Sequence, residues 1–375
     1  IRVPGSIPKM MCFLFILPIF FIMDGNFFSV NLGSMKTDFH SIIVRMPNWI
    51  GDLVMATPVL EDLRRAFPEA EITAMCQSTI APLLEYDPAI NELFRFSKAK
   101  GFLRRIGERN IVAKLKKGKY DLGILLTNSF SSAWRFWQGN VKNKIGFKGE
   151  GRSLFLDEAV PFPANRKSQH LVVTYKQLLD PLGIPVSKTL PRLIVRDEEI
   201  QVAWKFVKRF DITQEQKIIG INPGAAYGSA KCYLPERFRA VAERLLEADP
   251  SYIILFFGDI SHKGLIGGIC KGLSQRVVNL AGQTSLRELM ALIKICSVFL
   301  TNDSGPMHMA DSLETPLLAL FGSTDPIVTG PYRQSQHIIQ KNVPCAPCFK
   351  RECPIDFPCM KKIEVDEVVE ALLTL

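Results

Sequence analysis

Several motifs that mark large enzyme classes are missing from this sequence of 375 residues. There is no G-x-G-x-x-G, which argues against a dinucleotide-dependent oxidoreductase, and no G-x-x-x-x-G-K-[ST], which argues against a P-loop NTPase. H-E-x-x-H is also missing, and none of the five histidines is paired at metal-ligand spacing, which argues against a zinc hydrolase. No long low-complexity tract and no short-period repeat is present.

The composition is that of a folded, water-soluble protein, with 47% hydrophobic and 22% charged residues. The chain is long enough for two domains that each bury a core of their own. A net charge of +9 favours anionic partners. Phosphorylated ligands, an anionic membrane face and nucleic acid all remain open on that fact alone.

The N-terminal extension, residues 1–35, differs from the rest of the chain. Its apolar run Met10–Met23 contains Pro18 and is short for a membrane span, which needs about 20 apolar residues. It suits the core of a signal peptide better, although no small-x-small cleavage site follows it. A clean start at Met35 offers another interpretation, in which the preceding residues are an upstream translation artefact. A weak membrane anchor is the remaining alternative, and the extension is left out of the fold prediction.

From His40 onward, short apolar runs alternate with amphipathic stretches, which predicts β-α-β units around parallel sheets. The predicted strands are SIIVRMP, EITAMC, YDLGILLT, KIIGINPG, YIILFFGD, VVNLAG, VFLTND and PLLALFGS. Helices are predicted at 57–67, 235–248, 264–273 and 285–294. A Pro-rich segment near 180–191 separates the two alternating regions. We therefore expect two doubly wound α/β domains, residues 36–190 and 191–375, with a cleft between them.

In open parallel sheets, ligands bind beyond the carboxyl ends of the strands. Those ends read RMPNWIGD, LTNSFSS, INPGAAYGSAK, FFGD, LAGQTS, LTNDSGPMH and FGSTDP, all rich in Gly, Ser, Asn or Asp. The next three stretches carry the chemistry among them.

TNDSGPMH predicts an anion site at a helix start. Asp303 or Ser304 can cap the helix, whose free backbone N–H groups and positive dipole end attract phosphate. Gly305 would let a ligand approach the backbone closely. The alternative is a plain capped helix with His308 as a polar packing residue. The candidate ligand-binding residues here are Asn302, Asp303, Ser304, Gly305, Pro306, Met307 and His308.

NPGAAYGSAK is a loop with two glycines and one cation, Lys231. A flexible ammonium beside such a loop suits the neutralisation of a diphosphate. Asn222 and Gly224, at the start of the loop, are further candidates for ligand binding. The alternative for Lys231 is a solvated surface lysine.

PNWIGDLVMATP places Asp52 directly after a glycine at the end of the first strand. A carboxylate facing the expected cleft can act as a general base toward a sugar hydroxyl. The alternative is an N-cap aspartate for the helix that follows.

Together these segments resemble the ADP-heptose:lipopolysaccharide heptosyltransferases, glycosyltransferase family 9. The resemblance rests on RMPNWIGDLVMATPVLEDLRRAFPEAEI, YDLGILLTNSFSSAWRFW, NPGAAYGSAK, LAGQTSLRELMALI and TNDSGPMHMADSLETPLLALFGSTDP, from about residue 41 to the C-terminus. It implies a GT-B enzyme of two Rossmann-like domains, inverting and with no required metal or other cofactor. Residues 36–190 would hold the lipid A–inner core acceptor, and residues 191–375 the ADP-heptose donor.

The resemblance also implies roles for individual residues. Asp52 would be the catalytic base, while Lys231 and the NDSGPMH turn would bind the diphosphate of the donor. The family often has a tryptophan shortly after this lysine, whereas this chain has Tyr233, which leaves the packing of the loop in doubt. Alternatives are a related transferase with a different donor or acceptor, and a catalytically silent module that binds sugar nucleotides or membranes.

The basic stretch 97–119 is either a solvated helix face or a docking surface for phosphorylated lipid A and the anionic inner leaflet. Docking predicts salt-sensitive liposome binding that weakens when Arg104, Arg105, Lys116 and Lys117 are neutralised. Nucleic acid is not expected as a partner, because no aromatic stacking surface interleaves the charges. We expect a monomer in the cytoplasm, bound peripherally to the inner face of the membrane.

The last stretch of interest is Cys-rich, within residues 345–359 and before an expected C-terminal helix. Its C-x2-C-x4-C-x5-C spacing fits a zinc or iron–sulfur site, two small disulfides, or reduced thiols. Stable disulfides are disfavoured in a cytoplasmic enzyme. The residues are Cys345, Cys348, Cys353 and Cys359.

Overall fold

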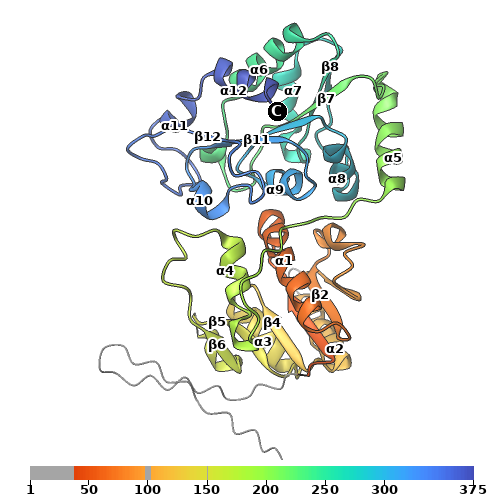
Figure 1. Ribbon diagram of the computed structural model, residues 1–375, viewed down its shortest axis with the longest axis vertical. Helices are drawn as coiled ribbons and strands as arrows, with labels where there is room; N and C mark the ends of the chain where they lie inside the picture. The colour runs from red at the N-terminus through yellow and green to blue at the C-terminus, as the bar shows by residue number, and fades with distance from the viewer. Residues whose placement is uncertain (1–37, 98–102, 150) are drawn as a thin grey trace, which may run out of the picture. The chain divides into compact units, whose positions relative to one another are not determined.

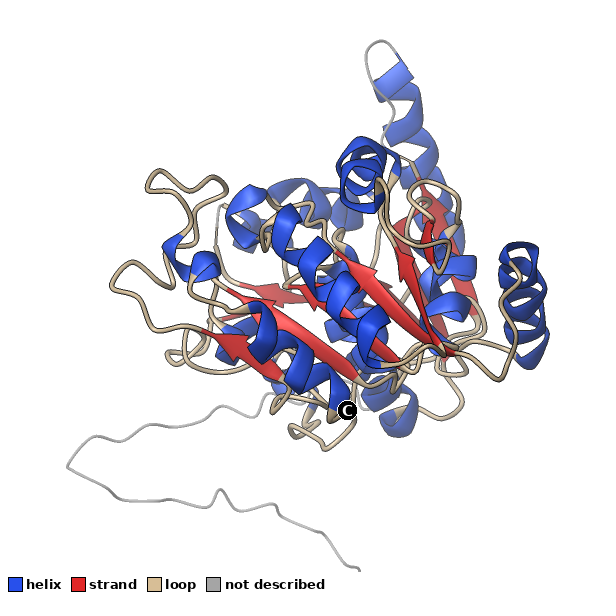
Figure 2. Cartoon of the chain, turned by 90° about the horizontal axis from the view of Figure 1, so that it is seen from above, coloured by secondary structure: helices blue, strands red, loops and turns tan. Residues whose placement is uncertain are grey.

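Two fully parallel six-stranded sheets organise the chain in a computed structural model that describes residues 38–97, 103–149 and 151–375. The N-terminal extension, residues 1–35, lies outside the described residues, and so do the predictions made for it. Each sheet carries its own helices (Figure 1), and helices cover both faces of the strands (Figure 2). The predicted α/β class is confirmed.

The first sheet has the order β3-β2-β1-β4-β5-β6. Its strands are β1 Ser41–Arg45, β2 Glu71–Gln77, β3 Glu92–Phe96, β4 Leu122–Leu125, β5 Lys144–Phe147 and β6 Glu158–Val160. The second sheet has the order β12-β11-β10-β7-β8-β9. Its strands are β7 Lys217–Asn222, β8 Tyr252–Phe256, β9 Val277–Asn279, β10 Val298–Asn302, β11 Leu317–Phe321 and β12 Ile338–Gln340.

The two orders are the same pattern, 3-2-1-4-5-6 counted within each sheet, which is that of a dinucleotide-binding Rossmann fold. In the first sheet, β2 and β3 lie on one side of β1 and the later strands lie on the other, so the strand order switches between β1 and β4. In the second sheet it switches in the same way between β7 and β10. Ligands bind at such switch points, outside the carboxyl ends of the strands.

The helices are α1 Ile50–Ala66, α2 Leu103–Gly118, α3 Phe130–Gln138, α4 Leu171–Gln177, α5 Asp197–Val207, α6 Pro235–Ala248, α7 Lys263–Cys270, α8 Leu286–Lys294, α9 Gly305–Ser312, α10 Pro326–Thr329, α11 Pro358–Lys361 and α12 Val365–Leu373. Single 3₁₀ turns are η1 Ala81–Leu84, η2 Arg152–Phe155, η3 Asp180–Leu182, η4 Lys208–Phe210, η5 Ser229–Lys231 and η6 Ile260–His262.

Helix α1 begins at Ile50, seven residues before the predicted start at Thr57. Pro58 lies inside the helix, where it has no N–H to give to the carbonyl four residues earlier. That carbonyl belongs to Val54, and it accepts a bond of 2.8 Å from the Thr57 hydroxyl instead. The helix therefore continues through the proline.

The central strands are buried on both faces, as parallel sheets require. In the second sheet, β10 and β11 are buried along their whole length, and β7 is buried after its first residue. Helix α6 starts with Pro235 in its first turn, as predicted, and α8 has a capping box formed by Ser285 and Glu288. The helix-start signals and the buried strands therefore both lie where an α/β fold requires them.

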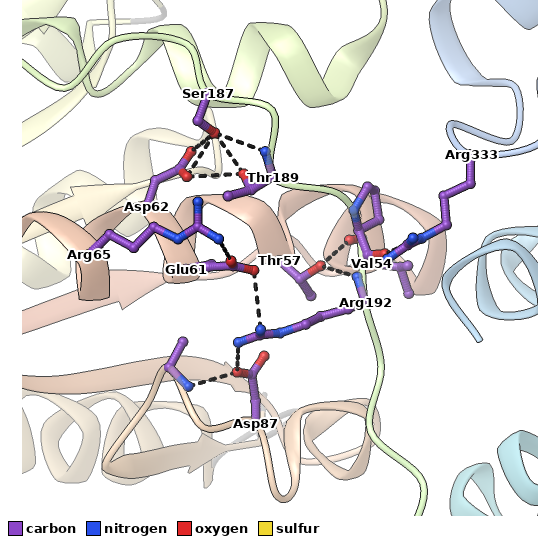
Figure 3. A network of polar contacts seen from close by, with 12 residues as sticks. Val54, Thr57, Glu61, Asp62, Arg65, Asp87, Ser187, Thr189, Arg192 and Arg333 are labelled. Carbon is purple, nitrogen blue, oxygen red and sulfur yellow. Dashed lines mark hydrogen bonds and ion pairs between the residues drawn. The ribbon is translucent and has the colours of Figure 1, made fainter. Parts of the chain in front are cut away.

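The segment that connects the two sheets is bonded to α1 (Figure 3). The Ser187 hydroxyl donates to the Asp62 carboxylate at 2.8 Å, and the Thr189 hydroxyl does so at 3.0 Å. Arg192 bridges Glu61 and Asp87, each at 3.1 Å. This part of the connection is therefore fixed on the first sheet's side.

Contacts with a loop and a helix on the second sheet's side begin next to that point. Arg333 donates through Nε to the Pro191 carbonyl at 3.1 Å, and Arg287 of α8 binds the Ile194 carbonyl at 2.9 Å and the Glu199 carboxylate. Within a few residues of Arg192, the partners of the connecting segment thus change from residues of the first sheet's side to residues of the second sheet's side.

Candidate functional site

A cavity of about 470 Å³ lies at the carboxyl ends of β1, β7, β8 and β10. Both switch points contribute to it, because its walls come from the turns after β1, β7 and β10. Its lining residues are Trp49, Ile50, Gly51, Asp52, Met55, Asn222, Gly224, Ala226, Tyr227, Lys231, Gly258, Asp259, His262, Thr284, Ser285, Leu286, Leu289, Asp303, Ser304, Gly305, Pro306, His308 and Thr329. The predicted residues from three separate stretches therefore meet in one place.

Asp52 lies in the first turn of α1, but it is not the N-cap. The N-cap is Trp49, so the alternative of a capping aspartate is wrong. Burial raises the pKa of the Asp52 carboxyl to about 6, with the Asp303 carboxylate adding to the rise and the Lys231 ammonium opposing it. A carboxylate with a pKa in this range is suited to general base catalysis near neutral pH.

Lys231 reaches the turn after β10. Its Nζ lies 2.5 Å from Oδ2 of Asp303, and the Thr324 hydroxyl donates to the same oxygen at 2.6 Å. The ammonium also lies 4.9 Å from the centre of the Tyr227 ring. Lys231 is therefore largely buried and held in place, and the alternative of a solvated surface lysine is wrong.

Helix α9 begins at the predicted anion site, and Ser304 is its N-cap. The Ser304 side chain makes no capping bond to the helix; its hydroxyl instead bonds the Thr301 hydroxyl at 3.0 Å and the Asn222 amide at 3.3 Å. The side chain that usually occupies the first-turn N–H groups is thus used elsewhere. The positive end of α9 is directed at the cavity wall formed by Ser304, Gly305 and Pro306.

Two glycines let α1 and α9 approach closely. A Cβ on Gly305 would lie 2.9 Å from Cβ of Ile50, and a Cβ on Gly51 would lie 2.6 Å from Cδ2 of His308. We expected Gly305 to give a ligand room near the backbone. Gly305 does line the cavity, and that expectation stays a prediction. The structure shows in addition that the missing side chain makes room for α1, which brings Asp52 up to the second sheet's turns.

His308 is buried, and burial lowers the pKa of its imidazole to about 3, with His170 and Lys231 opposing a further positive charge. The ring is therefore neutral at physiological pH. It packs on Gly51, as the packing alternative predicted, and it also lines the cavity, so a contact with a ligand stays a prediction.

Two of the predicted residues, Asn302 and Met307, are not in the cavity lining. The Asn302 side chain bonds the Tyr233 N–H at 2.9 Å and the Pro223 carbonyl at 2.8 Å. It holds the loop after β7 against the end of β10. Met307 is fully buried, because it faces inward from the first turn of α9.

The loop that carries Lys231 is fastened to the Cys-rich segment. Ala230 donates its N–H to the Arg351 carbonyl at 2.9 Å, and the Tyr227 hydroxyl donates to the Phe349 carbonyl at 2.9 Å. Gly228, at φ +153°, touches the same segment, since a Cβ there would lie 2.3 Å from the Arg351 oxygen. Only glycine fits at that position.

Tyr233, where the family often has tryptophan, is buried beneath this loop. Its hydroxyl donates to the Ile363 carbonyl at 2.9 Å, and its ring packs edge-to-face on Phe238. The tyrosine thus keeps a polar contact with the segment before α12, which settles how the loop packs in this chain.

The four cysteines of the Cys-rich segment are free thiols that line one small cavity of about 40 Å³. Burial raises the pKa of the Cys359 thiol, with Cys345 and Cys353 adding to the rise. Within the described residues, no three side chains of His, Cys, Asp or Glu are grouped so that they could hold a metal ion. In this structure the four cysteines are thus not arranged as the ligands of a zinc or iron–sulfur site.

Sequence reasoning missed several residues of the main cavity, including Trp49, Tyr227, Asp259 and His262. His262 pairs with Asp259 at 3.0 Å, and its ring occupies the space next to Gly224, where a Cβ would lie 2.7 Å from Nε2. The strand-end rule marked the segments that contain Trp49, Tyr227 and Asp259, which are RMPNWIGD, INPGAAYGSAK and FFGD, but not the individual side chains. His262 lies three residues beyond FFGD and had no such signal.

Comparison with known proteins places this geometry in a family. The sequence profile of glycosyltransferase family 9 (heptosyltransferase) matches residues 109–357. The chain belongs to this family. It is a glycosyltransferase with the GT-B fold, as the resemblance implied.

Individual relatives agree with that membership. The chain is 32% identical over 314 residues to lipooligosaccharide heptosyltransferase 2 of Haemophilus ducreyi, covering 80% of this chain and 88% of the relative. It is 30% identical over 313 residues to lipopolysaccharide heptosyltransferase 2 of Escherichia coli, covering 80% and 87%.

Solved structures give the same picture. The structure of E. coli ADP-heptose LPS heptosyltransferase II superposes with a TM-score of 0.75 at 27% identity, covering 89% of this chain and 98% of that one. A family 9 glycosyltransferase from Veillonella parvula gives a TM-score of 0.80 at 25% identity, covering 91% and 98%. No helix among the described residues is long and apolar enough to cross a bilayer.

Proposed function

We propose that this glycosyltransferase moves a heptose from ADP-L-glycero-D-manno-heptose to the heptosyl inner core of lipopolysaccharide, with inversion at the anomeric carbon. The observation that supports it best is the meeting of Asp52 with the Lys231–Asp303 pair in one cavity. The relatives named lipooligosaccharide or lipopolysaccharide heptosyltransferase 2 make heptose the preferred sugar and lipopolysaccharide the preferred acceptor.

In the proposed reaction, Asp52 takes the proton from the acceptor hydroxyl. The freed oxygen attacks the anomeric carbon on the face opposite the diphosphate, and the bond from that carbon to the phosphate oxygen breaks. ADP leaves with the electron pair of this bond. Inversion follows because the new bond and the old one lie on opposite faces.

The departing diphosphate gains negative charge, which the site must stabilise. Lys231 supplies a fixed positive charge, and the first turn of α9 supplies N–H groups and a helix dipole. Because these groups offset the charge without a metal ion, we expect the reaction to proceed in the presence of EDTA.

We propose that residues 36–190 bind the acceptor and residues 191–375 the donor. Asp52 comes from the first sheet, on the acceptor's side, whereas Lys231, Asp303 and α9 come from the second. A base carried by one sheet and a leaving-group site carried by the other suit a transfer that happens between them.

The lipid acceptor would require the enzyme to work at a membrane. Helix α2 exposes Arg105, Lys116 and Lys117, which suits docking on an anionic leaflet. Action as a monomer and a location at the cytoplasmic face of the membrane remain predictions.

A transfer assay with ADP-heptose and defined heptosyl acceptors tests the function, with ADP release and product mass as readouts. We expect one added heptose per ADP released, on an acceptor that already carries a core heptose. Transfer only to a heptose-free acceptor, or only from another sugar nucleotide, would favour the related transferase. Donor binding with no transfer to any acceptor would favour a silent binding module.

A further inference from the structure

A cluster of aromatic side chains lies on α3 and the turn η2, just after the carboxyl end of β4. The Trp134 ring stacks on Trp137 at 4.9 Å and meets Phe155 edge-on at 5.0 Å, while Phe130 meets Phe155 at 5.3 Å. The cluster is nevertheless open to solvent: Phe130 is 46% exposed, Trp137 51% and Leu154 83%. We call these four ringed side chains, together with Leu154, the chain neighbour of Phe155 in η2, the aromatic patch.

A basic groove of about 550 Å³ lies beside the patch, between α2 and α3. Arg105, Arg109 and Lys116 line it from one face of α2, as their spacing of four and seven residues requires. The acid among its lining residues, Glu108, is engaged at both oxygens by Arg135 of α3, at 2.5 Å each. The net charge of the groove is therefore positive.

The groove and the patch share helix α3. Gln138 lines the groove, and its chain neighbour Trp137 belongs to the patch. Ile106, 48% exposed on α2, adds an apolar side chain next to the cations. A cationic groove bordered by exposed Trp, Phe and Leu is the composition that binds the interface of an anionic bilayer.

We propose that the aromatic patch and the basic groove together form the membrane-docking surface, with anionic phospholipid headgroups in the groove and the patch at the boundary of the acyl chains. The inference rests on the proposed function, because it specifies how an enzyme with a lipid acceptor reaches its membrane. The docking predicted from the sequence depends on the positive charges of α2 alone. Here, part of the binding is assigned to the apolar side chains of Phe130, Trp137 and Leu154.

The chemistry of the patch favours a lipid over the sugars of the acceptor. Leu154, its most exposed member, has neither a flat face for stacking on a sugar ring nor a group for hydrogen bonding. In contrast, a bilayer interface accepts leucine and aromatic side chains together.

Co-sedimentation with phosphatidylcholine vesicles, with and without phosphatidylglycerol, separates the two contributions. Leu154→Ser should weaken binding to anionic vesicles about tenfold at any salt concentration, since it removes apolar burial. Arg105→Gln, Arg109→Gln and Lys116→Gln should each weaken it about fivefold at low salt only. The control for the lost leucine is Leu373→Ser, at an exposed leucine on α12. The controls for the lost cations are Lys205→Gln and Lys208→Gln, at exposed lysines of α5 and its C-terminal end.

Depth of insertion is the decisive readout. In a Trp49→Phe, Trp204→Phe background, emission comes from Trp134 and Trp137, because the sequence holds four tryptophans. Vesicles of brominated phosphatidylcholine mixed with phosphatidylglycerol should quench this emission. Binding without quenching, or full binding by Leu154→Ser, would overturn the proposal. A shift caused by delipidated core oligosaccharide but not by vesicles would overturn it in favour of an acceptor-sugar surface.

Failure here is distinguishable from failure of the proposed function. Leu154→Ser should keep the wild-type rate of transfer to a delipidated, soluble acceptor while it loses vesicle binding. A wild-type enzyme with no transfer to that acceptor would count against the proposed function, whatever the vesicles show.

Discussion

The Lys231 ammonium lies 2.5 Å from the Asp303 carboxylate, and this pair joins the turns after β7 and β10 at the switch point of the second sheet. Thr324 binds the same carboxylate oxygen and so fixes its position. The pair therefore fixes the Lys231 ammonium at a defined place in the cavity wall. A charge fixed before the reaction stabilises a leaving group without the cost of reorganisation.

The first prediction concerns that charge. Lys231→Gln should lower kcat about 10²- to 10³-fold, as the loss of one group that stabilises developing charge does elsewhere. The substitution also leaves the buried Asp303 carboxylate without its charged partner, so the thermal unfolding temperature should fall and kcat is measured at a temperature where the variant is folded. Lys205→Gln, an exposed lysine on α5, is the control for the loss of charge alone. A kcat within a factor of about three of the wild type would contradict a role in transfer.

The second prediction concerns pH. Because burial raises the Asp52 pKa to about 6, the base is ionised above that pH and protonated below it. We expect kcat/KM to be level near neutral pH and to fall about tenfold per unit below about pH 6. Asp52→Glu keeps a carboxylate but places it one methylene further along the side chain, so the midpoint of the pH profile should move. A flat profile through this range would show that no such carboxyl controls the reaction.

The third prediction concerns the contact between α1 and α9. Gly305→Ala would put a methyl group 2.9 Å from Ile50, so the helices must separate. We expect a loss of about 1–3 kcal/mol in the free energy of unfolding, together with a lower kcat because Asp52 shifts with α1. The control is Gly264→Ala in α7, where nothing lies within 4 Å of the added carbon and alanine favours the helix. Equal stability of the two variants would refute the packing role of Gly305.

The fourth prediction concerns the connection between the sheets. Arg192→Met removes the partner of the buried Asp87 carboxylate, which lies 3.1 Å away. Leaving a buried charge without its partner destabilises a protein by about 3 kcal/mol. Thermal unfolding of Arg192→Met, Asp87→Asn and the double variant forms a cycle. The double variant should recover part of the loss, and strict additivity would show that the two side chains act independently.

The fold was largely predictable because its signals are local. Eight strands were predicted from apolar runs, and they appear as β1, β2, β4 and β7 through β11. The missed strands β3, β5, β6 and β12 are three to five residues long. Length alone does not explain the misses, because the predicted strands β4 and β9 have only four and three residues. The missed segments ELFRF, KIGF, EAV and IIQ mix charged or polar residues with apolar ones, and three of them lie at a sheet edge, so they lack the apolar run that marks a strand buried on both faces.

The site was predictable as a set of strand ends, but its internal geometry was not. Strand order brings Asp52, Lys231 and Asp303 together, and the rule for parallel sheets captures that. In contrast, the fit of Gly305 against Ile50 depends on two segments about 250 residues apart, a pairing that no local pattern encodes. The same holds for Gly228, whose need for glycine comes from Arg351.

The most direct test of the account is Asp52→Asn. Asparagine keeps the size of the side chain and removes its ability to take a proton. Burial raises the Asp52 pKa from 3.8 to about 6, so the cost in stability of ionising this carboxyl grows as the pH rises between these two values and is fully present at neutral pH. Asp52→Asn should therefore fold at least as well as the wild type near pH 7.

The measurement pairs the transfer rate of Asp52→Asn with its affinity for ADP by calorimetry. The account predicts that kcat falls at least about 10²-fold, in line with the loss of a general base, while the Kd for ADP stays nearly unchanged. Near-wild-type transfer by a folded Asp52→Asn enzyme would contradict the assignment of Asp52 as the base.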